Sequence, residues 1–254
     1  MRRALIKVIA SNIAALFFIP LASAQENNMQ QAPDGIFMVG ALAGASSSAL
    51  IGKDKFMPLP FIFYHNKYVT LETTSLYLHP VETGPFQVSA VGSMRVSNIE
   101  LSSDDRLKDF DRNIAFEVGA HASFSFSNFS LYSQYLTDVT DAHGGEEITI
   151  GLNWEKQLGQ LRLSAGGGAH HRSSELTTYL YGVTAKDAAS GYVVHDLKSD
   201  WYPFAEVRAS YPISGRWGLV LTGSAERLPE ATVLSPIVEK RNNLMVGTGI
   251  TYTF

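Results

Sequence analysis

The last thirteen residues of the chain, 242–254, most constrain what it can fold into. Apolar residues alternate there with small or polar ones. The apolar set is Leu244, Val246, Ile250, Tyr252 and Phe254, with Thr248 as the polar member in phase. This period of two runs longer than the roughly five or six residues of an ordinary strand, and it suits a strand tilted across a membrane. The pattern favours a transmembrane β-barrel over an edge strand of a soluble β-sandwich.

The first 24 residues have the features of a secretory signal peptide. Three basic residues near the start precede an apolar run over 8–21, and Ala22-Ser23-Ala24 forms a small-residue cleavage box. A membrane anchor is the alternative, but the run is short for a span and is interrupted by Ser11 and Asn12. We therefore expect cleavage after Ala24 and a single exported domain over 25–254.

The composition of the remaining chain narrows the class further. There is no cysteine, so an exported chain must be stable without disulfides. Removing the three basic residues of the signal from the 20 in the sequence leaves 17 against 24 acidic ones, a net charge of −7. That balance argues against a nucleic-acid partner. After the signal, no apolar stretch is long enough for a membrane helix, so a membrane-bound form would cross with strands.

Alternation recurs from residue 35 to the end and predicts an all-β, antiparallel, up-and-down barrel. Short turns near 127, 158 and 214 alternate with long loops near 105, 142, 185 and 234. Outer-membrane barrels are connected this way, with short periplasmic turns and longer extracellular loops. A soluble sandwich has no reason to keep every second connection short. We expect apolar faces in lipid and a hydrated, polar bore.

The strand count is expected to be even. Eleven strands are evident, but a single-chain barrel with both ends in the periplasm needs an even number. The phase breaks between Leu71 and Leu76, where a turn at Thr73-Thr74-Ser75 can hide a short hairpin. This predicts twelve strands, with ten as the alternative. In the second strand, Pro58 and Pro60 remove two ladder donors, so one side of its upper part is expected to be poorly paired.

Several polar residues lie in phase with the small polar set and are therefore expected to face the bore. They are Glu117, His121, Glu155, Glu206 and Arg208. His121 with Ser123 or Ser125 is also similar to the pairs of barrel lipid hydrolases, but any polar stripe repeats at this spacing. His170-His171 and the acidic loop 104–111 lack the spacing of a phosphate or calcium site. No catalytic residue, metal or cofactor is predicted.

Short motifs in a consistent order resemble the MltA-interacting protein (MipA/OmpV) family of outer-membrane proteins. They are Leu59-Pro60-Phe61, Asp104-Asp105-Arg106-Leu107, Tyr181-Gly182-Val183, Ala188-Ala189-Ser190-Gly191-Tyr192, Gly215-Arg216-Trp217, Ser235-Pro236-Ile237-Val238 and Tyr252-Thr253-Phe254. At Leu234 the family often has an acidic residue, which leaves the subfamily open. The last strand, with Ile250, Tyr252 and Phe254, resembles the signal read by the barrel-assembly machinery.

The resemblance implies a non-enzymatic barrel in the lipid of the outer membrane that scaffolds peptidoglycan-synthesising and peptidoglycan-cleaving enzymes. Its partners would include a lytic transglycosylase and a penicillin-binding protein. Tyr181, Ser190, Gly191, Ser235 and Pro236 are the loop positions that match. The alternatives are a narrow pore and a surface protein linked to adhesion. The charges in the bore motivate the pore, because a twelve-strand barrel lies between the filled eight-strand size and the open porins.

Overall fold

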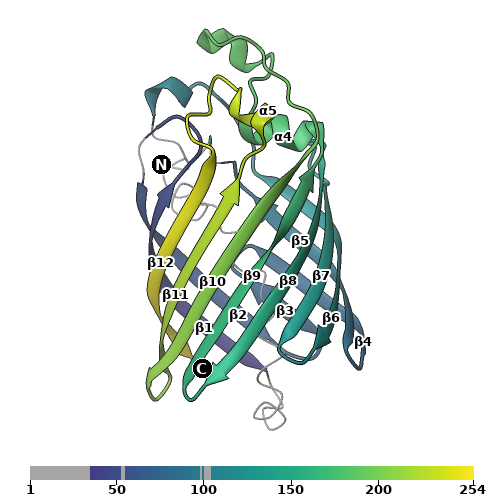
Figure 1. Ribbon diagram of the computed structural model, residues 1–254, viewed down its shortest axis with the longest axis vertical. Coiled ribbons are helices and arrows are strands. Elements are labelled where there is room, and N and C mark those ends of the chain that lie inside the picture. Colours follow the sequence, from purple (N-terminus) through teal and green to yellow (C-terminus); the bar gives the residue numbers. More distant parts are fainter. Residues whose placement is uncertain (1–34, 53–54, 98, 100–103) are drawn as a thin grey trace.

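The sheet closes on itself as a barrel. The computed structural model describes residues 35–52, 55–97, 99 and 104–254, so the expected signal peptide lies outside the described residues. Within them, each strand pairs antiparallel with its sequence neighbours and β1 pairs with β12 (Figure 1). The strands are β1 (Ile36–Ser47), β2 (Lys55–His65), β3 (Val69–Glu72), β4 (Ser75–Thr83), β5 (Phe86–Arg95), β6 (Ala115–Phe126), β7 (Phe129–Asp138), β8 (Glu146–Leu158), β9 (Leu161–Arg172), β10 (Asp200–Ser214), β11 (Trp217–Arg227) and β12 (Asn242–Thr253). The predicted twelve-strand barrel is confirmed.

The two ends of the barrel differ in how the strands are joined. At one end, which we call the turn end, the connections are as short as 84–85, 127–128, 159–160 and 215–216. At the other, the loop end, the connections include 96–114, 173–199 and 228–241. Figure 1 shows the long loops gathered above one rim of the barrel and the tight turns at the opposite rim. This is the alternation predicted from the sequence.

A short hairpin explains the broken phase near residue 73. β3 and β4 pair from Val69 with Leu78 to Leu71 with Leu76, on either side of a turn at 73–74. β3 has four residues, so it reaches only the turn-end part of β2, from Phe63 to His65. The twelfth strand therefore lies where the phase break predicts it.

The remainder of β2 has a strand on one side only. It pairs with β1 along its whole length, whereas its pairing with β3 in the described residues stops at Phe63. The backbone N–H of Ile62 donates to Thr73 Oγ1 on the β3 side. Backbone N–H groups two residues apart point to the same side of a strand. Pro58 and Pro60 therefore occupy the positions whose N–H groups would face the same edge as that of Ile62. The poorly paired side is confirmed, and the prolines remove donors that no strand there could satisfy.

One side of the bore is apolar, which corrects the expectation of a uniformly polar bore. Inward-facing residues of β1, β2, β11 and β12 form a buried cluster that we call the apolar sector. Its members are Leu42, Leu59, Phe61, Phe63, Val220 and Met245, with Met38 packed against them. The outward residues Phe56 and Ile62 of β2 are apolar as well, and they are exposed. Alternation on β2 therefore could not indicate which face turns inward.

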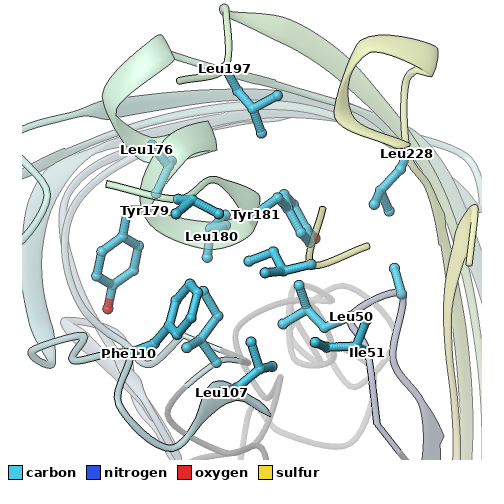
Figure 2. Packing of buried hydrophobic residues seen from close by; sticks show 14 of the residues in the cluster. Leu50, Ile51, Leu107, Phe110, Leu176, Tyr179, Leu180, Tyr181, Leu197 and Leu228 are labelled. Carbon is cyan, nitrogen blue, oxygen red and sulfur yellow. The ribbon is translucent and has the colours of Figure 1, made fainter. Parts of the chain in front are cut away.

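The long loops pack together over the loop end as a cap. It contains α4 (Ser174–Tyr181) and α5 (Glu230–Val233), with 3-10 turns η2 (Asp105–Leu107) and η3 (Asp187–Ser190). Figure 2 shows its buried apolar side chains converging from the loops after β1, β5, β9 and β11. The helix α4 was not predicted from the sequence. No helix in the described part of the chain is long and apolar enough to cross a membrane.

Candidate functional site

The predicted bore residues lie inside the barrel, but they belong to three separate groups. Glu117, His121, Glu155 and Glu206 are each at most 6 % exposed, and Arg208 is half-buried. Glu155 and Glu206 group with Arg208, whose charge interacts with both of theirs. Glu117 lies in a second group close to the loop end, and His121 lies in a third. The structure therefore does not bring all five together.

A glycine on β9 makes room for the first group. A Cβ on Gly166 would lie 3.2 Å from Glu206 Oε1 and 3.3 Å from Asn153 Oδ1. On the same strand, Arg162 Nε lies 3.5 Å from Glu155 Oε1. The glycine run thus permits close packing around a buried carboxylate, which is the role expected of glycine within a strand.

The ring of His121 is held by aromatic packing. It stacks on Tyr132 with ring centroids 5.8 Å apart and meets Tyr77 edge-on at 5.9 Å. Glu117, the acid that a triad would need beside it, binds Arg95 instead. Among the described residues, no group of three or more His, Cys, Asp or Glu side chains is placed to hold a metal ion.

Glu117 belongs to a set of buried or partly buried charges that we call the ionic belt: Arg95, Glu117, Glu147, Arg172 and Glu226. Arg95 donates to Glu117 and Glu147 at 2.7 and 3.0 Å. Arg172 donates to Glu147 and Glu226 at 2.7 and 2.6 Å. Each charge has an opposite partner, which offsets the cost of removing it from water. Sequence reasoning missed all of these except Glu117, although Glu147 has the same parity on β8 as Glu155 and could have been found.

Tyr181 connects the cap to the ionic belt. Its hydroxyl donates to Glu226 Oε1 at 2.9 Å and accepts from Asn243 Nδ2 at 2.8 Å. Its carbonyl accepts from Ser235 Oγ at 2.6 Å, so two of the motif positions meet across 54 residues of sequence. Burial and the neighbouring Glu226 raise the pKa of Tyr181 well above its usual value, which keeps the hydroxyl protonated and able to donate.

A buried ion pair ties the β5–β6 loop to the β9–β10 loop. Arg112 donates to both carboxylate oxygens of Asp187, at 2.8 and 2.7 Å. It also donates to the carbonyl oxygens of Tyr179 and Gly182 at 3.0 and 3.3 Å. Burial alone would raise the pKa of Asp187, but hydrogen bonds from Arg112 and Thr184 outweigh it and hold that pKa below its usual value. The pair fixes two cap loops to one another.

The other motif positions lie elsewhere in the cap. Ser190 ends η3, and Gly191 follows it with φ of 87°, a left-handed conformation that favours glycine. Pro236 is exposed beside the buried Ser235. The structure therefore brings Tyr181 and Ser235 into contact, while Gly191 serves a local turn.

The last strand presents its predicted assembly signal on the outer face at the turn end. Ile250 and Phe254 are exposed and Tyr252 is half-buried. Phe254 stacks on Phe37 at 5.2 Å, and Tyr252 meets Trp217 edge-on at 4.9 Å. Aromatic residues on the outer face near a rim are typical of membrane barrels. Recognition by the assembly machinery stays a prediction.

A pocket of about 440 Å³ lies at the turn end, and we call it the turn-end pocket. Residues of the apolar sector, among them Phe61 and Phe63, line part of it. Arginines from β9, β10 and the 215–216 turn line another part. Space within the barrel is therefore found at the end opposite the cap.

A family model and several known outer-membrane proteins are similar to this chain. The family model for MltA-interacting protein MipA matches residues 39–254. The MltA-interacting protein of Escherichia coli K12 is 27 % identical over 229 residues, which cover 87 % of this chain and 91 % of that protein. Outer membrane protein OmpV of Vibrio cholerae is 24 % identical over 153 residues, 60 % of each chain. An outer membrane channel from Pseudomonas putida F1 has 11 % identity and a TM-score of 0.47, covering 88 % of this chain and 97 % of that one.

These relatives also settle the compartment and hence the orientation. This chain lies in the outer membrane, because its relatives are named outer membrane proteins and its strands form a closed barrel. In such barrels the long loops face outward and the short turns face the periplasm. The cap is therefore extracellular and the turn-end pocket periplasmic. The chain belongs to the family of MltA-interacting protein MipA.

Proposed function

We propose that this protein is a non-enzymatic scaffold that holds peptidoglycan enzymes at the periplasmic face of the outer membrane. The observation that carries the proposal is the contrast between the ends of the barrel. The cap and the ionic belt fill the extracellular end with packed apolar and paired charged side chains. This packing of the described residues is expected to hinder the passage of solutes, and the turn end faces the compartment that contains peptidoglycan.

The partners are proposed by class. A relative of this chain bears the name MltA-interacting protein, which supports a lytic transglycosylase as one partner. A penicillin-binding protein is the second, because cutting and synthesis of the wall must proceed together. The turns at 84–85, 159–160 and 215–216 are the surface that a periplasmic enzyme would meet.

A narrow pore is the second candidate function. Arg162, Glu155, Glu206 and Arg208 are charged groups in the bore, and they would line a selective passage if the cap opened. Conductance separates the two functions, because the scaffold is expected to be electrically silent.

The scaffold is tested by capture from solubilised envelopes. The tagged protein is expected to enrich a lytic transglycosylase and a penicillin-binding protein over an unrelated barrel that carries the same tag. A short epitope inserted at Gly215, on the turn end, is expected to reduce capture at least tenfold. The matched insertion at Gly144, in a loop-end connection, is expected to leave capture unchanged. Both variants must show the heat-modifiable migration of a folded barrel. Absence of enrichment, or equal capture by both variants, would contradict the proposal.

A further inference from the structure

The apolar sector is unusual for a bore. Inward positions of membrane barrels are normally polar, because they face water. Here Phe61, Phe63, Met38 and Val220 lie inside the barrel and form one contiguous patch. These four residues pack against other members of the apolar sector, and they also line the turn-end pocket. An apolar wall therefore borders space that is reached from the periplasmic end.

Positive charge lies on the other side of the same pocket. Arg162, Arg208 and Arg216 line it, and none of the described residues that line it is Asp or Glu. Arg162 and Arg208 interact with carboxylates deeper in the bore, whereas Arg216 stands exposed on the turn at the rim. The pocket thus combines an apolar wall with basic groups, of which Arg216 lies at the rim. Its volume of about 440 Å³ lies in the range of pockets that enclose small ligands.

We propose that the turn-end pocket binds a single-chain anionic amphiphile, with its acyl chain against the apolar sector and its head group on the arginines. An acyl chain gains from covering apolar surface that water would otherwise contact. A carboxylate or phosphate head group gains charge-assisted hydrogen bonds from guanidinium groups. A sugar would leave the apolar wall uncovered, and a neutral lipid would leave the arginines unmatched. The proposal does not depend on the scaffold function.

The rim of the pocket provides a way in from the membrane. Tyr211, Trp217 and Phe254 contribute to its lining and are also exposed on the outer face. Aromatic residues at such a rim sit at the level of the lipid head groups. An amphiphile in the periplasmic leaflet would therefore have its head group close to Arg216. Free fatty acid and lysophospholipid share this chemistry.

Photo-cross-linking tests where the chain binds. The folded protein is reconstituted in phosphatidylcholine vesicles with palmitate that carries a diazirine at the end of its chain, and labelled residues are mapped by mass spectrometry. Labels are expected on inward residues such as Phe61 and Phe63. The methyl ester of the same probe is expected to label them at least tenfold less. Labels confined to outward residues such as Ile62 and Leu221, which do not line the pocket, or equal inward labelling by the ester, would overturn the proposal.

Adjacent positions on β11 offer a matched pair of variants. Val220→Trp would fill the pocket, whereas Leu221→Trp places the same side chain on the outer face, where Leu221 is 57 % exposed. Inward labelling is expected to fall at least tenfold in V220W and to stay unchanged in L221W, with both variants folded by heat-modifiable migration. If V220W fails to fold, Arg216→Gln replaces it, with a severalfold loss of labelling by palmitate expected. Unchanged labelling in the folded variant would overturn the proposal.

Competition identifies the source of the ligand. Unlabelled palmitate and unlabelled palmitoyl lysophosphatidic acid are added separately to the wild-type reaction. Stronger competition by one of them assigns the natural ligand to that class, and both outcomes support the anionic site. If neither reduces inward labelling, the site does not recognise anionic amphiphiles.

Discussion

The two ends of this barrel are held by different interactions. At the loop end, apolar residues from several loops pack as in the core of a soluble domain, above a belt of paired charges. At the turn end the connections are too short to pack over the bore, and a pocket lies there. The barrel wall and the closure of its loop end therefore depend on different interactions. The wall is built by strand ladders, and the closure is built by side chains contributed from distant loops.

Removing Arg112 should affect the loop end most strongly. Arg112→Met leaves the buried Asp187 carboxylate, and the three carbonyl groups that accept hydrogen bonds from Arg112, without their cation. Breaking a buried pair in this way costs about 3–5 kcal/mol. We expect a loss of this size in urea unfolding of the protein in lipid vesicles, with faster proteolysis of the β9–β10 loop.

Arg106→Met is the control for that experiment. Arg106 pairs with Asp104 and Glu239 on the surface of the same cap, where solvent screens the interaction. No measurable change in stability is expected. Equal losses in the two variants would show that the cap is not a packed unit.

Removing one hydroxyl from the junction between cap and belt should have an intermediate effect. Tyr181→Phe keeps the ring but leaves Glu226 and Asn243 each without one hydrogen bond. We expect unfolding to become easier by about 1–3 kcal/mol. Tyr192→Phe is the control, because the Tyr192 ring lies at the edge of the same cluster, where it meets Phe110. A silent Tyr181→Phe would remove the proposed link between cap and belt.

Acid should loosen the cap by a smaller amount. The pKa of Asp187 is lowered in the folded protein. The charged carboxylate therefore stabilises the fold at pH values above about 3.9, which is the pKa of Asp in an unfolded chain. That contribution is lost as the pH falls through the lower folded pKa. Hydrogen exchange of amides 183–191, corrected for intrinsic rates, is expected to stay constant from pH 7 to about 4 and to rise below it. In Asp187→Asn the exchange should be independent of pH over this window. Loosening between pH 7 and 5 would assign the effect to another group.

The wall could be predicted from the sequence because strands repeat every two residues. The period and parity of β6, β8, β10 and β12 gave the orientation of their side chains, and the broken phase located the β3–β4 hairpin. The two prolines of β2 indicated an edge without a partner. Where both faces of a strand are apolar, as around Phe61 and Ile62, period two carries no information about inside and outside.

The closure could not be predicted in the same way. Buried cap residues such as Leu107 and Leu176 follow no period, and α4, with eight residues, is too short to be stable without the packing around it. The ionic belt joins Arg95 with Glu147, 52 residues apart, so no local pattern shows the pair. The motif positions Tyr181 and Ser235 lie far apart in the sequence, so their contact could not be predicted from it.

The central claim is that the extracellular end is filled by the cap while the twelve strands close into a barrel. Planar-bilayer conductance of the purified, folded protein in concentrated KCl tests it most directly, with an open general porin as the positive control in the same bilayer. A twelve-strand barrel is wide enough to conduct if its bore is clear. We predict no stable conductance steps for the wild-type protein. Stable steps of a size expected for an open twelve-strand barrel would contradict this account.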